Sequence, residues 1–360
     1  MSEKVKLGEL GEIVSGSTPK TNIKEYWDGE ILWITPAEIQ EDDYYIADTQ
    51  RKITDLAVEK TNLKLLPKGT VLLSSRAPIG KVAICDNDMY CNQGFKNIIC
   101  SDRLENRYVY YFLKHNVEYI KSLGRGATFK EISKGIVENL EISYREKKEQ
   151  IEIANKLDKI TEILKIRKQQ IKQFDEIIKS QFVEMFGDPI LNNKNWNLNK
   201  WNEVLTIKNG KNQKKVEQND GEYPIYGSGG IMSYANDYIC NEDSVIIGRK
   251  GNINNPILVR TRFWNVDTAF GLEPNKEKLI VEYLYYFCDF YNFEKHNKAV
   301  TIPSLTKNDL LNIDIPIPPI ELQNQFADIV KQIDKQKFEI ENSLKEMQEL
   351  YESLMEKYFG

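Results

Sequence analysis

Two polar stretches of the chain, at about 146–186 and 321–358, carry apolar residues at steps of three and four. This spacing is typical of the apolar seam of a coiled-coil helix. The first seam consists of Ile153, Leu157, Ile160, Leu164, Ile171, Phe174, Ile178 and Met185. The second consists of Phe326, Ile329, Ile333, Ile340, Leu344, Met347, Tyr351, Leu354 and Tyr358. Arg167 and Gln181 interrupt the first seam and Gln336 the second. Each stretch of roughly 40 residues predicts a helix about 60 Å long.

The two predicted helices are expected to pair. One such helix cannot bury its apolar stripe alone, but two can bury each other's stripes. Because the chain runs out along the first helix and returns along the second, an antiparallel coiled coil is the simplest arrangement. The alternative is that each helix packs on its own domain. Gly187 and Pro189 form a stop signal after the first helix, and the sequence stops at Gly360, the equivalent of Gly187, which indicates two complete units.

The segments that precede the two helices repeat each other. Residues 7–16, 66–76, 91–95, 108–113, 126–134 and 139–142 align with 201–210, 241–249, 266–270, 283–288, 299–307 and 312–315. The last two matches join without a gap, and Thr301 lies 173 residues after Thr128. A period of that length indicates duplication of a whole domain rather than a solenoid repeat.

These patterns predict an α+β fold with an internal pseudo-twofold repeat. Two similar mixed α/β domains are separated by two long helices that form an antiparallel coiled coil. The predicted boundaries are 1–145 for the first domain, 146–190 for the first long helix, 191–318 for the second domain and 319–360 for the second long helix.

Composition narrows the class of protein. Hydrophobic residues make up 41% and charged residues 29% of the chain, which is ordinary for a globular protein. No apolar run approaches the roughly 20 residues that cross a bilayer, and no signal peptide opens the sequence, so we expect a cytoplasmic protein without membrane contact. The five cysteines include no Cys-x2-Cys pair and there are two histidines, which argues against a zinc site and favours reduced thiols.

The net charge of −5 argues weakly against binding to DNA, but the charges are segregated. Residues 25–48 hold eight carboxylates and no Lys or Arg. Residues 61–85, 244–265 and the surroundings of Arg125 and Lys298 hold Lys and Arg without acids, and Lys208 to Lys215 form a basic loop. The basic windows fall at equivalent places in the two copies, and solvated surface is the alternative explanation for each.

The same windows also contain Gly, Asn, Gln, Ser and Thr. Lys, Arg and backbone N–H groups contact phosphates, whereas Arg, Asn and Gln read base edges. The predicted DNA-binding residues are Lys20, Arg76, Lys81, Asn92, Gln93, Arg125, Thr128, Lys130, Lys211, Tyr226, Gly229, Arg249, Lys250, Asn252, Lys298, Thr301 and Ser304.

Motifs for catalysis are missing from the sequence. It contains no phosphate-binding G-x-x-x-x-G-K-[ST] loop, no G-x-S-x-G elbow, no H-E-x-x-H, and no Asn-Pro-Pro-aromatic tetrapeptide of the kind that amino-methyltransferases use. We therefore predict no catalytic residue, no metal site and no cofactor on this chain.

Over its whole length the chain resembles the specificity subunits of type I restriction–modification systems. Three motifs carry the resemblance: the domain opening at 7–13, the Arg-Ala-Pro-Ile-Gly-Lys turn at 76–81, and the domain exit at 312–325. The first copy departs from the exit motif, because Ser143, Tyr144 and Arg145 replace its prolines.

The resemblance implies two target-recognition domains, each reading one half of a bipartite, asymmetric DNA site. It implies that the helices set the length of the unread spacer and dock two methyltransferase subunits, which use S-adenosylmethionine to methylate adenine. It further implies motor and nuclease subunits that use ATP and Mg²⁺. Two alternatives stay open at this point: a coiled-coil scaffold for protein interactions, and a stand-alone DNA-modifying enzyme with a degenerate site.

Overall fold

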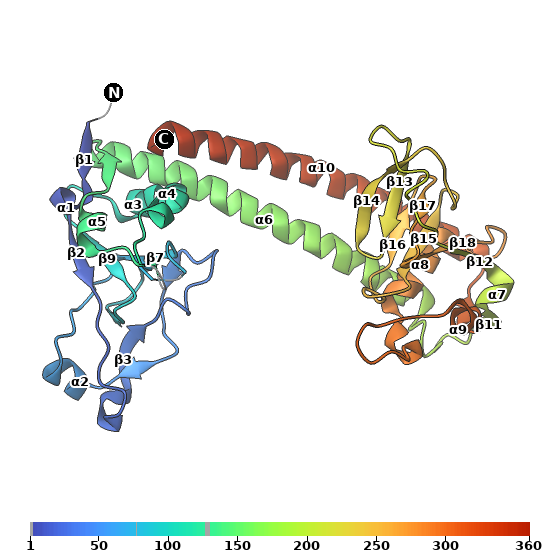
Figure 1. Cartoon of the computed structure of the whole chain (residues 1–360), viewed down its shortest axis with the longest axis horizontal. Coiled ribbons are helices and arrows are strands. Elements are labelled where there is room, and N and C mark those ends of the chain that lie inside the picture. Colours follow the sequence, from blue (N-terminus) through green and yellow to red (C-terminus); the bar gives the residue numbers. More distant parts are fainter. Residues whose placement is uncertain (1–2, 77, 127–129) are drawn as a thin grey trace. The chain divides into compact units, whose positions relative to one another are not determined.

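The computed structural model describes residues 3–76, 78–126 and 130–360, so Thr128 lies outside the described residues. The chain forms two compact units (Figure 1). Unit 1 comprises residues 1–166 and 343–360, and unit 2 comprises residues 167–342. Each unit thus contains one mixed domain together with the adjoining parts of both long helices.

Unit 1 begins with a strand that pairs with the last strand of its domain. Its strands are β1 (Lys4–Lys6), β2 (Gly11–Ser15), β3 (Trp27–Ile34), β4 (Tyr45–Ile46), β5 (Lys52–Ile53), β6 (Val71–Leu73), β7 (Val82–Cys85), β8 (Tyr90–Cys91), β9 (Lys96–Cys100) and β10 (Glu141–Ser143). Its short helices are α1 (Leu7–Leu10), α2 (Asp55–Lys60), α3 (Asn106–His115), α4 (Val117–Ser122) and α5 (Lys134–Glu138).

The main sheet of unit 1 orders its strands β2-β9-β6-β7-β4, and a smaller sheet orders them β5-β3-β8. Strands β6 and β7 are buried along their whole length, as their unbroken apolar sequences require. Helix α3 covers this sheet with side chains such as Tyr108 and Phe112. Strand β1 pairs with β10, which brings the two ends of the domain together.

Unit 2 repeats this layout with different side chains. Its strands are β11 (Asn197–Lys200), β12 (Leu205–Asn209), β13 (Tyr223–Gly227), β14 (Gly230–Ala235), β15 (Ser244–Gly248), β16 (Ile257–Val259), β17 (Trp264–Asn265), β18 (Ala269–Pro274) and β19 (Asp314–Ile317). Its short helices are α7 (Trp201–Val204), α8 (Val281–Phe290) and α9 (Lys307–Leu311). The sheets are ordered β12-β18-β15-β16, β14-β13-β17 and β11-β19.

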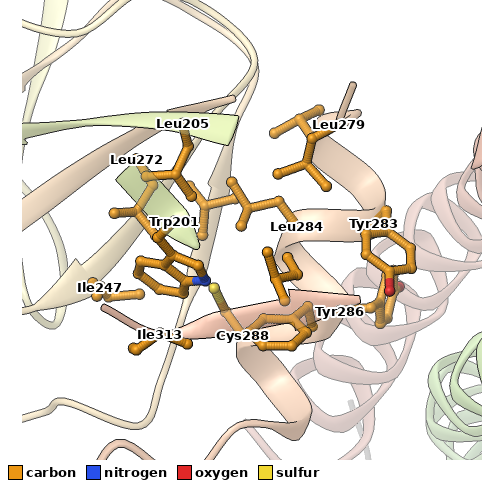
Figure 2. Packing of buried hydrophobic residues seen from close by; sticks show 14 of the residues in the cluster. Trp201, Leu205, Ile247, Leu272, Leu279, Tyr283, Leu284, Tyr286, Cys288 and Ile313 are labelled. Atoms are coloured by element: carbon orange, nitrogen blue, oxygen red, sulfur yellow. The ribbon is translucent and has the colours of Figure 1, made fainter. Parts of the chain in front are cut away.

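The core of unit 2 lies between its main sheet and α8. Figure 2 shows Trp201 in one cluster with Ile247 and Leu272 of the sheet and with Leu284 of the helix. The hydroxyl of Tyr283 donates to the carbonyl of Pro316 at 2.8 Å. In unit 1, the hydroxyl of Tyr108 donates to the carbonyl of Ser143 at the same distance, so the repeat extends to individual hydrogen bonds.

Two long helices, α6 (Lys147–Phe186) and α10 (Ile320–Phe359), follow the two domains, as the sequence predicts. Within unit 2, the ring of Phe182 packs on that of Phe326, with the ring centroids 5.4 Å apart. Further along, Lys337 Nζ lies 2.7 Å from Asp175 Oδ1. As the residue number decreases from 182 to 175 on α6, the number of the partner residue increases from 326 to 337 on α10. The two helices are therefore antiparallel.

The expected antiparallel pairing is confirmed, and the helices also pack on the cores of the domains. Phe182, Phe326 and Val330 belong to the core of unit 2, and Ile153 and Leu157 belong to that of unit 1. The predicted seam residues are buried or half-buried. Phe182 was missing from the predicted seam although it is fully buried, because the heptad frame assigned that turn to Gln181.

The predicted fold class, with two similar α+β domains and two long antiparallel helices, is confirmed. The boundaries at 145, 190 and 318 stay a prediction, because the compact units divide the long helices between them. Within the described ranges, none of the helices has both the length and the apolar character that crossing a bilayer requires.

Candidate nucleic-acid interface

Three strand ends meet at one edge of the main sheet in unit 1. Because β2, β9 and β6 are antiparallel neighbours, the end of β2, the start of β9 and the end of β6 lie side by side. The N–H of Ser17 donates to the carbonyl of Cys91 at 3.0 Å, and the N–H of Ser75 donates to that of Gly94 at 2.7 Å. We call the loops at this edge, 17–20, 91–95 and 74–76, reading edge 1.

Residues 125–126 and 130–131 lie on either side of the undescribed residues and form a fourth segment, in which Arg125 and Glu131 join reading edge 1 through backbone pairing. Glu131 pairs with both Arg76 and Arg125. Its carboxylate also lies 2.9 Å from Arg76 Nε and 3.3 Å from Lys96 Nζ. Burial alone would raise the pKa of Glu131, but hydrogen bonds from Arg76 and Lys96 outweigh that effect and leave the pKa below its usual value. Glu131 is therefore charged at neutral pH and fixes two cations beside the strand ends.

Unit 2 builds the same edge from β12, β18 and β15. The N–H of Lys211 donates to the carbonyl of Asn265 at 2.9 Å, and the N–H of Arg249 donates to that of Thr268 at 2.8 Å. Residues 297–305 supply the fourth segment, because the N–H of Leu305 donates to the carbonyl of Arg249 at 2.9 Å. We call the loops 210–211, 265–268, 249–252 and 297–305 reading edge 2.

The hydrogen bonds correct one detail of the sequence alignment. Ser75 and Arg249 make equivalent bonds to Gly94 and Thr268, and the next residue in each loop pairs with the fourth segment. Arg76 therefore corresponds to Lys250 and not to Arg249. The sequence alignment matched the two arginines because they are chemically alike, whereas the ladder pairing places them one residue apart.

Several predicted residues of unit 1 gather at reading edge 1. Lys20, Gln93, Arg125 and Lys130 are exposed there. The hydroxyl of Thr18 donates to the side-chain oxygen of Gln93, which orients that amide.

The other two candidates of unit 1 carry structural hydrogen bonds. Asn92 accepts from the N–H of Gly94 at 2.8 Å through Oδ1, which shapes its own loop. Lys81 Nζ donates to the carbonyls of Pro36 and Ile39 at 3.0 and 2.6 Å, so its ammonium fastens a loop inside the domain. A phosphate contact by Lys81 stays a prediction.

In unit 2, the exposed candidates are Lys211, Gly229, Lys250, Asn252 and Thr301. Gly229 lies in the turn of the β13–β14 hairpin, beside the strand that carries Tyr226. The ring of Tyr226 packs edge-on against Phe263 at 5.5 Å, and its carbonyl accepts from the N–H of Val266, next to reading edge 2.

The remaining three candidates are Arg249, Lys298 and Ser304. Arg249 is half-buried, with its guanidinium 3.2 Å from the carbonyl of Asp267. Lys298 Nζ lies 2.9 Å from Asp309, and the N–H of Ser304 donates to the side chain of Asn297 at 3.1 Å. The structure thus brings most of the predicted residues to two equivalent edges. Lys81 is an exception, because its ammonium bonds carbonyls inside the domain and not at reading edge 1.

The basic windows contain no acidic residue in the sequence, but acidic side chains from elsewhere in the chain lie next to several of their cations. Arg76 pairs with Glu131, Lys298 with Asp309, and Arg260 with Asp243 and Glu282. These carboxylates come from other parts of the chain and could not be assigned from sequence spacing. In the described ranges, the cations of the two edges for which no ion-pair partner is found are Lys20, Arg125, Lys130, Lys211, Arg249 and Lys250.

Beside reading edge 2, a cavity of about 490 Å³ was not foreseen from the sequence. Lys208, Lys211 and Lys307 line it together with Tyr238 and Trp264. The Trp264 indole donates to the carbonyl of Lys211 at 2.9 Å, so it is fixed in place. The basic loop at 208–215 supplies two of these lysines and was visible in the sequence. The third, Lys307, comes from the start of α9, and no local pattern places it beside that loop.

Groups that could hold a metal ion are not found among the described residues. The buried thiols are shifted away from reactivity, since burial raises the pKa of Cys91 to about 12. The two edges offer cations, amides, hydroxyls and backbone N–H groups, which are the groups that contact phosphates and base edges.

A family model for the type I restriction modification DNA specificity domain matches residues 2–174 and 193–350, which is most of the chain. The chain belongs to this family. Among its relatives, the type I restriction enzyme MjaIX specificity subunit of Methanocaldococcus jannaschii is 30% identical, over 91% of this chain and 85% of that protein. The type I restriction enzyme EcoprrI specificity subunit of Escherichia coli is 21% identical, over 91% and 86%.

Solved structures agree on the fold. The S subunit of a type I restriction–modification system from M. genitalium matches with a TM-score of 0.66 and 19% identity, over 100% of this chain and 96% of that one. A chain from a study of assembly of the type I R-M system matches with a TM-score of 0.62 and 18% identity, over 99% and 97%. The resemblance inferred from the sequence is confirmed, and so is DNA sequence recognition within a restriction–modification system. Neither the scaffold nor the stand-alone enzyme finds support in these comparisons.

Proposed function

We propose that this chain is the non-catalytic reader of a type I restriction–modification complex, and that each domain reads one half of a bipartite DNA site. One observation carries the proposal: the same set of strand ends forms an edge in both domains, with different side chains on it. Equivalent backbone bonds hold Ser75 to Gly94 and Arg249 to Thr268. Two domains that share a backbone arrangement but present different side chains are suited to recognising two different half-sites.

The side chains at the edges divide by the contacts they suit. Exposed cations such as Arg125, Lys211 and Lys250 fit phosphates, which position a protein on the duplex. Gln93 and Asn252 carry amides that can bond a base edge in two places, and each good contact of this kind contributes roughly 1–3 kcal/mol of discrimination. Phosphate contacts release counterions, so binding should weaken steeply with salt.

We propose that the long helices serve the partners of the complex. Exposed apolar side chains lie on both helices, among them Ile166 and Ile177 on α6 and Phe338 on α10, and exposed apolar groups favour protein contacts. We propose two methyltransferase subunits as their partners, with S-adenosylmethionine bound there, and motor and nuclease subunits that use ATP and Mg²⁺. We also propose a cytoplasmic location, where the DNA of the host is found.

The test uses the full chain, alone and with its methyltransferase partner. Binding to a labelled random duplex is followed by fluorescence anisotropy from 50 to 200 mM salt, and adenine methylation is assayed with S-adenosylmethionine. We expect salt-sensitive binding and methylation only when the partner is present. Methylation by the chain alone would show an enzyme, and no DNA binding in either case would favour a scaffold.

A further inference from the structure

The tip of the loop 297–304 carries two apolar side chains, Val300 and Ile302, that make few contacts with the rest of the protein. Val300 is fully exposed and 59% of Ile302 is exposed, although both are branched aliphatic residues. Isolated apolar residues are common on surfaces. Two of them at one loop tip, within a surface that is otherwise cationic and polar, call for a specific explanation.

The base of this loop is held firmly. Asn297 Oδ1 accepts from the N–H groups of Ala299 and Ser304 at 3.0 and 3.1 Å, which closes the loop on itself. The N–H of Gly251 donates to the carbonyl of Pro303 at 2.9 Å. Lys250 pairs with Ser304 through the backbone. The base of the loop is thus held to reading edge 2, and the tip projects from it.

Two lysines lie at the base of the loop that carries the apolar side chains. Lys250 is exposed next to the base of the loop, and 75% of the Lys298 side chain is exposed while its ammonium contacts Asp309. An apolar protein partner would have to desolvate these charges, whereas a DNA duplex supplies phosphates for them. Charge complementarity and continuity with reading edge 2 therefore point to duplex DNA as the occupant.

The repeat indicates what the tip does there. In the sequence, Ala127 and Phe129 stand where the second copy has Val300 and Ile302, with Thr128 and Thr301 between them. The two copies thus both have apolar residues at these positions, although the residues predicted to contact bases differ. A contact that serves two unlike half-sites cannot depend on the base sequence. Apolar side chains that insert between neighbouring base pairs from a groove make contacts of this sequence-independent kind.

We propose that Val300 and Ile302 form an apolar wedge that enters a groove of the duplex and unstacks one base-pair step beside the half-site read by unit 2. The inference rests on the proposed DNA-reading function. Such unstacking would ease the removal of a nearby base from the helix, which any enzyme that modifies a base in duplex DNA requires.

The experiment uses the full chain with its methyltransferase partner. Methylation sequencing first supplies the duplex, and 2-aminopurine then replaces one base at a time, leaving out the methylated adenine. The chain should raise the fluorescence at one step near the half-site of unit 2. The double variant Val300→Ser with Ile302→Ser should lose that rise, with affinity reduced by no more than about tenfold because the phosphate contacts remain. Leu191→Ser, which changes another exposed aliphatic residue of unit 2, should leave both unchanged.

The outcomes separate this inference from the proposed function. The wedge is ruled out if the chain binds the duplex but raises 2-aminopurine fluorescence at no base-pair step. It is equally ruled out if the double variant raises the fluorescence at the same step as the unchanged chain. It is also ruled out if the double variant loses the methyltransferase instead, which would make the tip a protein contact. If the unchanged complex does not bind the duplex at all, both the wedge and the proposed function fail.

Discussion

Gln150 and Gln323 make the same three hydrogen bonds at the starts of the two long helices. Both side chains are fully buried. Gln150 Oε1 accepts from the N–H of Glu105 at 2.9 Å, and Gln150 Nε2 donates to the carbonyls of Arg103 and Arg145 at 3.0 and 2.8 Å. One amide thereby connects the first turn of α6 to the turn before α3.

In the second copy, Gln323 Oε1 accepts from the N–H of Ile280 at 3.1 Å. Its Nε2 donates to the carbonyls of Lys278 and Pro318 at 3.0 and 2.9 Å. Asparagine is too short and glutamate cannot donate, so glutamine suits this place in both copies. In each copy, this side chain therefore ties the first turn of the long helix to its own domain.

Replacing Gln323 by alanine should destabilise unit 2. The substitution leaves one N–H and two carbonyl groups buried without a partner, which costs about 2–3 kcal/mol of unfolding free energy. Unfolding of the full chain in urea, followed by circular dichroism, measures the loss. Gln325→Ala provides the control, because Gln325 lies two residues further along the same helix and is exposed. Equal midpoints for the two variants would contradict the structural role given to Gln323.

Arg76 and Lys250 occupy equivalent positions, so their loss should have equivalent effects on DNA. Arg76→Ala or Lys250→Ala should reduce the slope of log affinity against log salt by about 1, with weaker binding to every sequence. Fluorescence anisotropy across a salt series measures the slope. Lys276→Ala is the control, since Lys276 is also exposed but pairs with Asp243 away from the edge. A slope that changes as much in the control would contradict the position of reading edge 2.

The layout of the repeat was open to prediction because it rests on local patterns. Steps of three and four predicted α6 and α10 to within a residue or two, and the alignment around Thr301 predicted the duplicated frame. The contacts of single residues do not follow from such local patterns. Lys81 is spaced like a phosphate ligand in the sequence, yet its ammonium bonds two carbonyls of its own domain. The carboxylate beside Arg76 belongs to Glu131, 55 residues further along the chain, and no local sequence pattern predicts this pair.

Glu131 should weaken DNA binding by unit 1, because its carboxylate lies beside Arg76 and Lys96. Glu131→Gln removes one negative charge from reading edge 1 and should raise affinity for random duplex about fivefold at low salt. Anisotropy at pH 7 and 50 mM salt measures the change, with Glu59→Gln, an exposed residue of α2, as the control. Unchanged or weaker binding by Glu131→Gln would contradict the placement of phosphates near this carboxylate.

The same carboxylate predicts a response to acid. Since the pKa of Glu131 is lowered in the folded chain, its ion pairs contribute stability above the unfolded pKa of about 4.3. That contribution is lost as the pH falls through the lowered value. Because Glu131→Gln lacks it at every pH, the difference in urea midpoint between Glu131→Gln and the unchanged chain should shrink between pH 6 and pH 3. A difference that stays constant would contradict the charged pairs.

The thiols should be slow to react while the chain is folded. Burial raises the pKa of Cys91 to about 12, so at neutral pH it holds far less thiolate than a free cysteine does. Mass spectrometry after brief iodoacetamide treatment at pH 7.5 should find Cys91, Cys240 and Cys288 unmodified until urea is added. Half-buried Cys100 should be the first to react. Rapid modification of Cys91 in the native chain would contradict its burial.

The central claim is that two similar domains with different reading edges recognise two different half-sites. Methylation sequencing of the genome of a host that expresses this chain with its methyltransferase partner tests it most directly. We predict methylated adenines within two short, unlike sequences separated by an unread spacer of fixed length. Arg249→Ala, or the removal of Asn252 by Asn252→Ala, should change only one of the two half-sites. A single continuous motif, or a change in both half-sites from a substitution in unit 2 alone, would contradict the account.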